Sequence, residues 1–182
     1  PRRARQQSPT GIYHWINRGI HHKNIFHRAA DYRYLLSLVK IYSRKYRVSV
    51  YHYCLMTNHV HMLVHVDELS KLFLFSHFIQ RCYAYHYAKT YGREGQVFRR
   101  RCRLLPIHKE TYLLECGRYI ERNPLRAGMI KKMDQYAYSS YSFYAKGTKD
   151  PVIDPSPAYL ALASTSIDKQ NTYRKYVSES RA

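Results

Sequence analysis

The 182-residue chain predicts an α+β fold in which a ferredoxin-like antiparallel sheet carries its helices on one face. The order of the hydrophobic periodicities is the first reason. Alternating and helical patterns follow one another as β-α-β-β-α-β and then one further helix. Length is the second reason, because a single domain usually has about 100–150 residues and this chain adds only short extensions. We expect the other face of the sheet to stay free for a ligand.

The first half of the chain has the clearest signals. Apolar residues alternate over 11–19, which indicates a strand, and they recur at helical spacing over 30–46. Segment 47–56 is rich in Val and Tyr and predicts a second strand. A Thr-Asn turn at 57–58 then leads into clean alternation over 59–66, which predicts the hairpin partner of that strand.

The second half predicts a helix over 68–91 ended by Gly92, a strand over 95–107 and a helix over 109–123. We expect Pro124 to end that last helix, because the residue before a proline disfavours helical geometry. Segment 124–150 is predicted to be irregular, and a short helix is expected near 157–164. The predicted organisation is a basic arm (1–10), a main domain (11–147) and a basic C-terminal extension (148–182).

Charge narrows the possible partners. Lys and Arg number 31 against 12 Asp and Glu, so the net charge is +19. Such an excess predicts a polyanionic partner, nucleic acid before an anionic membrane. No stretch approaches the roughly 18 apolar residues of a membrane span, and the basic N-terminus lacks the apolar region of a secretory signal. Four widely spaced cysteines without a C-x-x-C pair indicate reduced thiols in a cytoplasmic protein.

The basic residues supply candidate DNA contacts. Phosphate contacts made by such residues give affinity and strong salt dependence, whereas sequence choice must come from fewer residues. Strand alternation predicts that the odd-numbered arginines of 99–103 share one face. The candidates are Arg2, Arg3, Arg5, Arg18, Arg99, Arg101, Arg103, Arg126, Lys131 and Lys132.

A His-x-His pair is the sharpest local feature. His59 and His61 are two apart on a predicted strand and therefore project from the same face. Two neighbouring imidazoles can bind one divalent metal ion. The spacing does not name the metal, and two ordinary surface histidines are the alternative interpretation.

A second pair lies on the predicted helix 109–123. Tyr119 and Asn123 are four apart and share a helical face. An activated tyrosine can act as a covalent nucleophile, and an amide oxygen beside two imidazoles suits Mg²⁺ or Mn²⁺ better than zinc. The alternatives are a tyrosine that only packs and an asparagine that only ends the helix.

Together these segments resemble the REP-associated tyrosine transposases, a branch of the single-tyrosine HUH transposases (His, hydrophobic, His). The resemblance covers roughly residues 11–144 in the family's order and spacing. It is carried by Cys54-Leu55-Met56-Thr57-Asn58-His59-Val60-His61-Met62-Leu63-Val64, Arg118-Tyr119-Ile120-Glu121-Arg122-Asn123-Pro124-Leu125-Arg126-Ala127-Gly128, Tyr136-Ala137-Tyr138-Ser139-Ser140-Tyr141, Tyr13-His14 and Arg18-Gly19. Thr57 stands where the family usually has proline, which affects the turn, and the C-terminal extension lies outside the resemblance.

The resemblance implies an HUH-nuclease fold whose catalytic domain is 11–147. It makes His59 and His61 metal ligands, Tyr119 the nucleophile and Asn123 a third ligand for magnesium or Mn²⁺. Enzymes of this family cut single-stranded DNA beside a hairpin, here the bacterial repetitive extragenic palindrome. They leave a 5′-phosphotyrosine and a free 3′-hydroxyl and rejoin strands by reversal. The chain has no Gly-rich phosphate loop of the Walker type, which fits chemistry without a nucleotide cofactor.

The resemblance also bears on assembly and location. Related insertion-sequence enzymes are dimers that exchange the tyrosine helix, whereas the family resembled here is generally monomeric, so we expect a monomer and keep a dimer open. We expect a cytoplasmic, nucleoid-associated bacterial protein without membrane contact. Two other functions stay open: a protein on the same fold that binds nucleic-acid hairpins without cutting, and a rolling-circle or mobilisation HUH nuclease.

Overall fold

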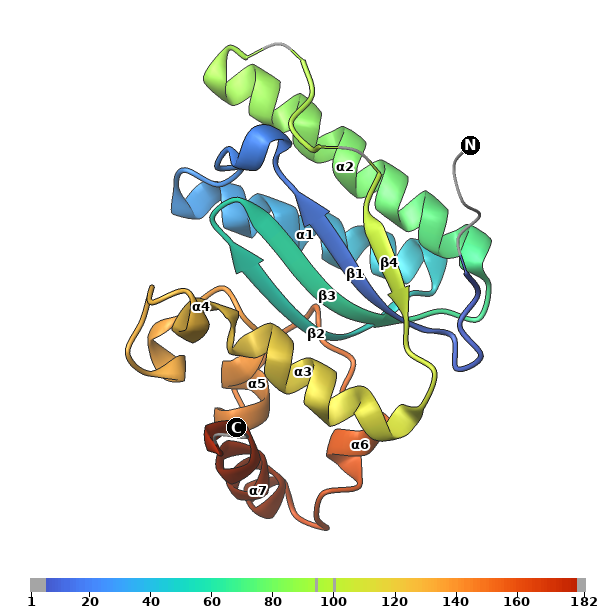
Figure 1. Ribbon diagram of the computed structural model, residues 1–182, viewed down its shortest axis with the longest axis vertical. Helices are drawn as coiled ribbons and strands as arrows, with labels where there is room; N and C mark the ends of the chain where they lie inside the picture. The colour runs from blue at the N-terminus through green and yellow to red at the C-terminus, as the bar shows by residue number, and fades with distance from the viewer. Residues whose placement is uncertain (1–5, 94, 100, 180–182) are drawn as a thin grey trace.

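A four-stranded antiparallel sheet forms the centre of the computed structural model, which describes residues 6–93, 95–99 and 101–179 (Figure 1). The strand order is β2-β3-β1-β4. The strands are β1 (Ile12–Arg18), β2 (Ser49–Met56), β3 (His59–His65) and β4 (Arg103–Pro106). Their pairing confirms the predicted α+β class and the predicted hairpin between the second and third strands.

Two long helices cover one face of the sheet, α1 (Ala29–Tyr46) and α2 (Leu69–Tyr91) (Figure 1). Alternation along β3 turns Val60, Met62 and Val64 toward these helices, where all three are buried. Trp15 of β1 is buried on the same side and donates from Nε1 to Oγ of Ser76 on α2 at 2.8 Å. This face of the protein is the main hydrophobic core.

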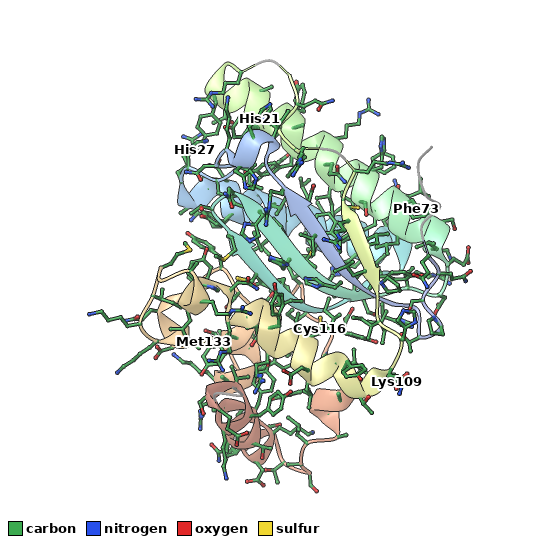
Figure 2. All side chains as sticks on the ribbon, in the orientation of Figure 1. His21, His27, Phe73, Lys109, Cys116 and Met133 are labelled. Atoms are coloured by element: carbon green, nitrogen blue, oxygen red, sulfur yellow. The ribbon has the colours of Figure 1, made fainter. Side chains whose placement is uncertain are left out.

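The opposite face is partly covered, which differs from the expectation that all helices lie on one side. Helix α3 (Leu113–Glu121) packs against β2 and β3 (Figure 1). Its Ile120 joins Leu63 and Cys54 of these strands in a second, smaller buried cluster. Cys116, labelled in Figure 2, packs against that cluster. Apolar residues on this face of β2 and β3, such as Cys54 and Leu63, are therefore covered by α3.

The segments around α3 also differ from the predicted pattern. The strand expected over 95–107 is reduced to the four residues of β4, preceded by an isolated bridge from Phe98 to Gly19. The helix expected over 109–123 is divided into a 3-10 turn (Glu110–Tyr112), α3 and the short α4 (Asn123–Arg126). Pro124 lies in the first turn of α4 rather than ending a helix, because the first turn of a helix does not need the missing N–H.

The C-terminal part is more helical than its composition indicates. The segment expected to be irregular contains a 3-10 turn (Met133–Gln135) and α5 (Tyr141–Lys146), and the extension contains α6 (Pro157–Leu160) and α7 (Ser166–Ser178). Helix α7 was not predicted, although Thr165 accepts a hydrogen bond from the backbone N of Asp168 in an N-cap pattern visible in the sequence. Tyr173 and Val177 of α7 are buried in the main core.

The cysteines and the hydropathy agree with the sequence-based expectations. None of the four cysteines forms a disulfide bond within the described residues, and Cys54 and Cys102 are buried. No helix within the described ranges combines the length and the apolar character that crossing a membrane requires.

Candidate active site

Strand register places imidazole and guanidinium groups side by side on the sheet face that α3 leaves partly open. In the antiparallel pair β1–β3, Arg18 lies opposite His59 and Ile16 lies opposite His61. In the pair β1–β4, Ile16 also lies opposite Arg103. Residues directly opposite one another in an antiparallel pair share a face. One row of the sheet therefore carries His61, Ile16 and Arg103, and the next row carries His59 and Arg18.

An open cavity of about 360 Å³ lies over these rows. Four arginines and the tyrosine of α3 line this cavity. Two of the arginines, Arg99 and Arg101, lie before the regular part of β4. Such a concentration of positive charge suits a phosphate chain. The cavity is lined by Ile16, Asn17, Arg18, His61, Arg99, Arg101, Arg103 and Tyr119.

The three aromatic groups of the predicted chemistry lie close together, and His61 and Tyr119 line this cavity. The ring centroids of His59 and His61 are 4.9 Å apart, and those of His61 and Tyr119 are 6.2 Å apart. A third imidazole, that of His14, lies 6.0 Å from the Tyr119 ring centroid and hydrogen-bonds through Nε2 to Nδ1 of His61 at 2.8 Å. Tyr119 is 44% exposed, so its ring is accessible to a ligand.

Hydrogen bonds fix which nitrogen of each imidazole is available. Nδ1 of His59 lies 2.6 Å from Oδ1 of Asn58, so it carries the proton and leaves Nε2 with a free lone pair. His61 uses Nδ1 in its bond with His14, which leaves its Nε2 as the outward nitrogen. Such partners on the second nitrogen are what orient metal-binding histidines.

Burial keeps these imidazoles neutral. It lowers the pKa of His59 to about 4, helped by the positive charge of Arg18 and by His22. It lowers the pKa of His61 to about 2, helped by the other two imidazoles. It also lowers the pKa of His14 to about 4, and Arg103 adds to that effect. Neutral imidazole is the form that binds metal ions.

The donor set fits a divalent metal only if a ligand of another type completes it. In the described part of the chain, no group of three or more His, Cys, Asp or Glu side chains is arranged to hold a metal ion. Asn123 begins α4 directly after α3, and its Nδ2 donates to the carbonyls of Tyr119 at 2.9 Å and Ile120 at 3.0 Å. This orientation turns Oδ1 away from those carbonyls. Two neutral imidazoles could bind a divalent metal ion if an oxygen ligand, such as this amide oxygen, completed the set.

A known protein family matches the larger part of the chain. The family model described as "Transposase IS200 like" matches residues 8–123, which include both histidines and the tyrosine. The chain belongs to this family of transposases. No curated protein matches the chain. The match confirms the resemblance to single-tyrosine transposases that the sequence motifs indicate.

A solved structure shares the fold of this transposase. It is described as the REP-associated tyrosine transposase bound to a REP hairpin, and it is 14% identical in sequence. The similarity covers 86% of this chain and 93% of that chain, with a TM-score of 0.63. The likeness therefore extends beyond the family match into the C-terminal part.

Other residues that the sequence proposed for DNA binding are distributed unevenly in the transposase. Arg126 of α4 lies over the Tyr119 ring, with Cζ 5.3 Å from its centroid. Lys131 and Lys132 are exposed in the loop after α4, where both backbone N–H groups donate to the side chain of Gln135, and they do not line the cavity. Arg2, Arg3 and Arg5 lie outside the described residues.

Two residues of the site were not singled out as site residues from the sequence. His14 appeared only as part of the first-strand motif, although alternation places it on the same face as Ile16 and so beside the His-x-His pair. Asn17 lines the cavity, is 2% exposed and has no hydrogen-bond partner at Nδ2 within the described structure. An unpaired buried donor costs about 1–3 kcal/mol, which makes this amide N–H a candidate donor to a ligand in the cavity. No sequence pattern marks that residue.

Proposed function

We propose that this transposase cleaves and rejoins single-stranded DNA at hairpin-forming palindromes of the REP kind, through a 5′-phosphotyrosine on Tyr119. One observation carries the proposal. Tyr119 stands beside His61 and His14 at the edge of a cavity lined by four arginines. A nucleophile, candidate metal ligands and phosphate-binding cations are the groups that phosphodiester transfer requires.

The proposed reaction balances with Tyr119 and the DNA as its only reactants. The Tyr119 oxygen loses its proton and attacks the scissile phosphorus. A new bond forms between that oxygen and the 5′-phosphate, and the bond from phosphorus to the 3′-oxygen breaks. The 3′-oxygen leaves with a proton as a hydroxyl. Because the phosphotyrosine retains the energy of the broken bond, the reverse attack by a 3′-hydroxyl joins strands without a nucleotide cofactor.

The surrounding residues bind and orient the DNA. Arg99, Arg101 and Arg103 hold phosphates on one side of Tyr119, and Arg126 places a further cation at its ring. His59, His61 and Asn123 would hold Mg²⁺ or Mn²⁺, which when bound would polarise the scissile phosphate and offset developing charge. His14 keeps the His61 ring in one orientation through their hydrogen bond.

The DNA partner and the assembly are part of the same proposal. The solved structure with this fold is bound to a REP hairpin, which supports a hairpin with single-stranded flanks as the substrate here. We propose a monomer, because α3 packs on the sheet of its own chain and brings Tyr119 to the histidines of that chain. A cytoplasmic location at the nucleoid fits a DNA substrate.

A covalent-adduct assay tests the proposal. The protein is incubated with Mg²⁺ and a REP hairpin oligonucleotide that has single-stranded flanks, and the protein–DNA adduct is separated on a denaturing gel. The wild-type protein should form the adduct, and Tyr119→Phe should form none. An adduct with Tyr119→Phe would disprove the nucleophile. Normal cleavage by a His59→Ala/His61→Ala variant in the presence of a chelator would disprove the metal role. Tight hairpin binding without cleavage under any divalent metal would favour a binding protein on the same fold.

A further inference from the structure

Polar side chains connect the C-terminal helix α7 to α3, the helix that carries Tyr119. We propose that α7 is a positioning element for this tyrosine, a role that rests on the proposed function of Tyr119. Helix α7 follows the region 8–123 that the family model matches, so membership of the family assigns it no role. Figure 1 shows α7 on the far side of α3 from the sheet.

Glu121 is the first connection. Its carboxylate is 1% exposed and lies at the last residue of α3. Tyr173 of α7 donates its hydroxyl to Oε2 at 2.8 Å, and Ser140 donates to Oε1 at 2.6 Å. The Nδ1 of His52 on β2 lies 3.0 Å from Oε1. A buried carboxylate is stable only when such partners satisfy it, so these three contacts hold α3 in one place.

This anchor determines the direction in which Tyr119 points. Residues two apart on an α-helix project about 200° apart, since each residue adds about 100°. Glu121 therefore points into the protein while Tyr119 points out toward the cavity, which agrees with their exposures of 1% and 44%. A rotation of α3 that broke the Glu121 contacts would swing the Tyr119 ring away from the imidazoles.

Arg118 of α3 and Arg122, the C-cap residue of α3, form the second connection. Arg118 donates from Nη1 to the carbonyls of Tyr176 at 3.4 Å and Glu179 at 3.3 Å. Arg122 donates to the carbonyls of Val177 at 3.2 Å and Glu179 at 2.9 Å. These carbonyls belong to the last turn and the C-cap of α7, where helical partners are missing and cations are favourable. Each helix thus stabilises the other through residues next to Tyr119 and Glu121 in the sequence.

The test separates the rate of the reaction from DNA binding. Tyr173→Phe removes one hydroxyl from the Glu121 anchor and leaves the ring in place. With the REP hairpin oligonucleotide and Mg²⁺, we expect adduct formation at saturating DNA to slow about 10- to 100-fold, because small displacements of a reacting group cost this much. The dissociation constant for the hairpin, measured in a chelator, should stay within about twofold because the arginines of the cavity are unchanged.

A matched variant controls for the loss of a buried hydroxyl. Tyr159→Phe removes a hydroxyl that donates to the carbonyl of Tyr144 at 3.0 Å, within the C-terminal helices and not to α3. This control should keep the wild-type rate at temperatures well below its unfolding midpoint. Equal rates for Tyr173→Phe and Tyr159→Phe would overturn the proposal, and so would parallel losses of rate and affinity in Tyr173→Phe.

A second variant keeps the proposal testable if Tyr173→Phe does not fold. Arg122→Gln removes the half-buried cation that donates to carbonyls at the end of α7. It leaves Glu121 and its partners intact. It should slow the adduct step and raise amide hydrogen exchange in α3 but not in α1, and unchanged values of both would overturn the proposal. Tyr119→Phe is run beside it. An adduct with Tyr119→Phe shows that the proposed function itself has failed, whereas its absence together with a normal rate in Arg122→Gln refutes the role of α7 alone.

Discussion

Gly117→Ala is the substitution whose outcome the packing of α3 predicts most sharply. A Cβ built at Gly117 would lie 2.6 Å from Cε1 and Nε2 of the His52 ring and 2.8 Å from Cδ2. Ordinary carbon contacts are about 3.5–4.0 Å, so the ring or the helix must move by about 1 Å. The ring has little freedom, because it is fully buried, stacks on Tyr144 at 4.3 Å and is bonded to Glu121.

Two opposing free energies decide the result. Alanine is about 1 kcal/mol better than glycine inside a helix. Overpacking a well-packed core costs about 1–3 kcal/mol. We expect Gly117→Ala to destabilise the protein by about 1 kcal/mol net. Displacement of α3 should also slow adduct formation by Tyr119 about tenfold or more.

The predicted effect of Gly117→Ala on stability changes sign when the His52 ring is removed. In a His52→Ala background the new methyl group meets no ring, so Gly117→Ala should stabilise that variant by about 0.5–1 kcal/mol. Urea unfolding followed by the fluorescence of the only tryptophan, Trp15, measures all four proteins. The same sign of Gly117→Ala in both backgrounds would refute the reasoning, whatever its magnitude.

Three further predictions concern the core, the cavity and pH. Ser76→Ala should cost about 1–3 kcal/mol in stability, measured by urea unfolding, because it leaves the buried Trp15 N–H without its acceptor, and it should leave the adduct rate unchanged. Arg101→Ala should reduce the magnitude of the slope of log affinity against log salt concentration by about 0.7 for single-stranded DNA. An unchanged slope would show that Arg101 does not contact a DNA phosphate. Burial lowers the pKa of His14 to about 4. Below about pH 6.5 the unfolded chain therefore binds a proton at His14 that the folded metal-free protein does not bind. The unfolding free energy should therefore fall as pH drops from about 6.5 toward 4, with a smaller fall in His14→Asn, and equal falls would contradict the assigned pKa.

Strong local patterns made the sheet and its long helices predictable. Alternation in residues 59–66 correctly placed Val60 in the core and His61 on the other face, because the two-residue period of a strand is imposed by the backbone itself. Gly92 ends α2 in the left-handed conformation that favours glycine, at φ +60°. Both features depend only on neighbouring residues.

Elements defined by distant partners were less predictable. Strand β4 is short because only residues 103–106 reach β1, a limit that its own sequence does not encode. Helix α7 buries only Tyr173 and Val177 within an otherwise polar segment, so its periodicity is weak. Helix α4 spans four residues, which is too short for any hydrophobic period to appear.

The sequence by itself determined the parts of the candidate site and the faces on which they stand. The sequence predicted that His59 and His61 share a strand face and that Tyr119 and Asn123 share a helix face. The net charge of +19 indicated a polyanionic partner. Tertiary structure alone decided which of these parts meet. Strand register brought His14 and Arg103 to His61, and packing of α3 across the sheet set Tyr119 beside them. The physical reason is that local periodicity fixes the direction in which each side chain points. The distance between remote segments depends instead on which apolar surfaces bury one another.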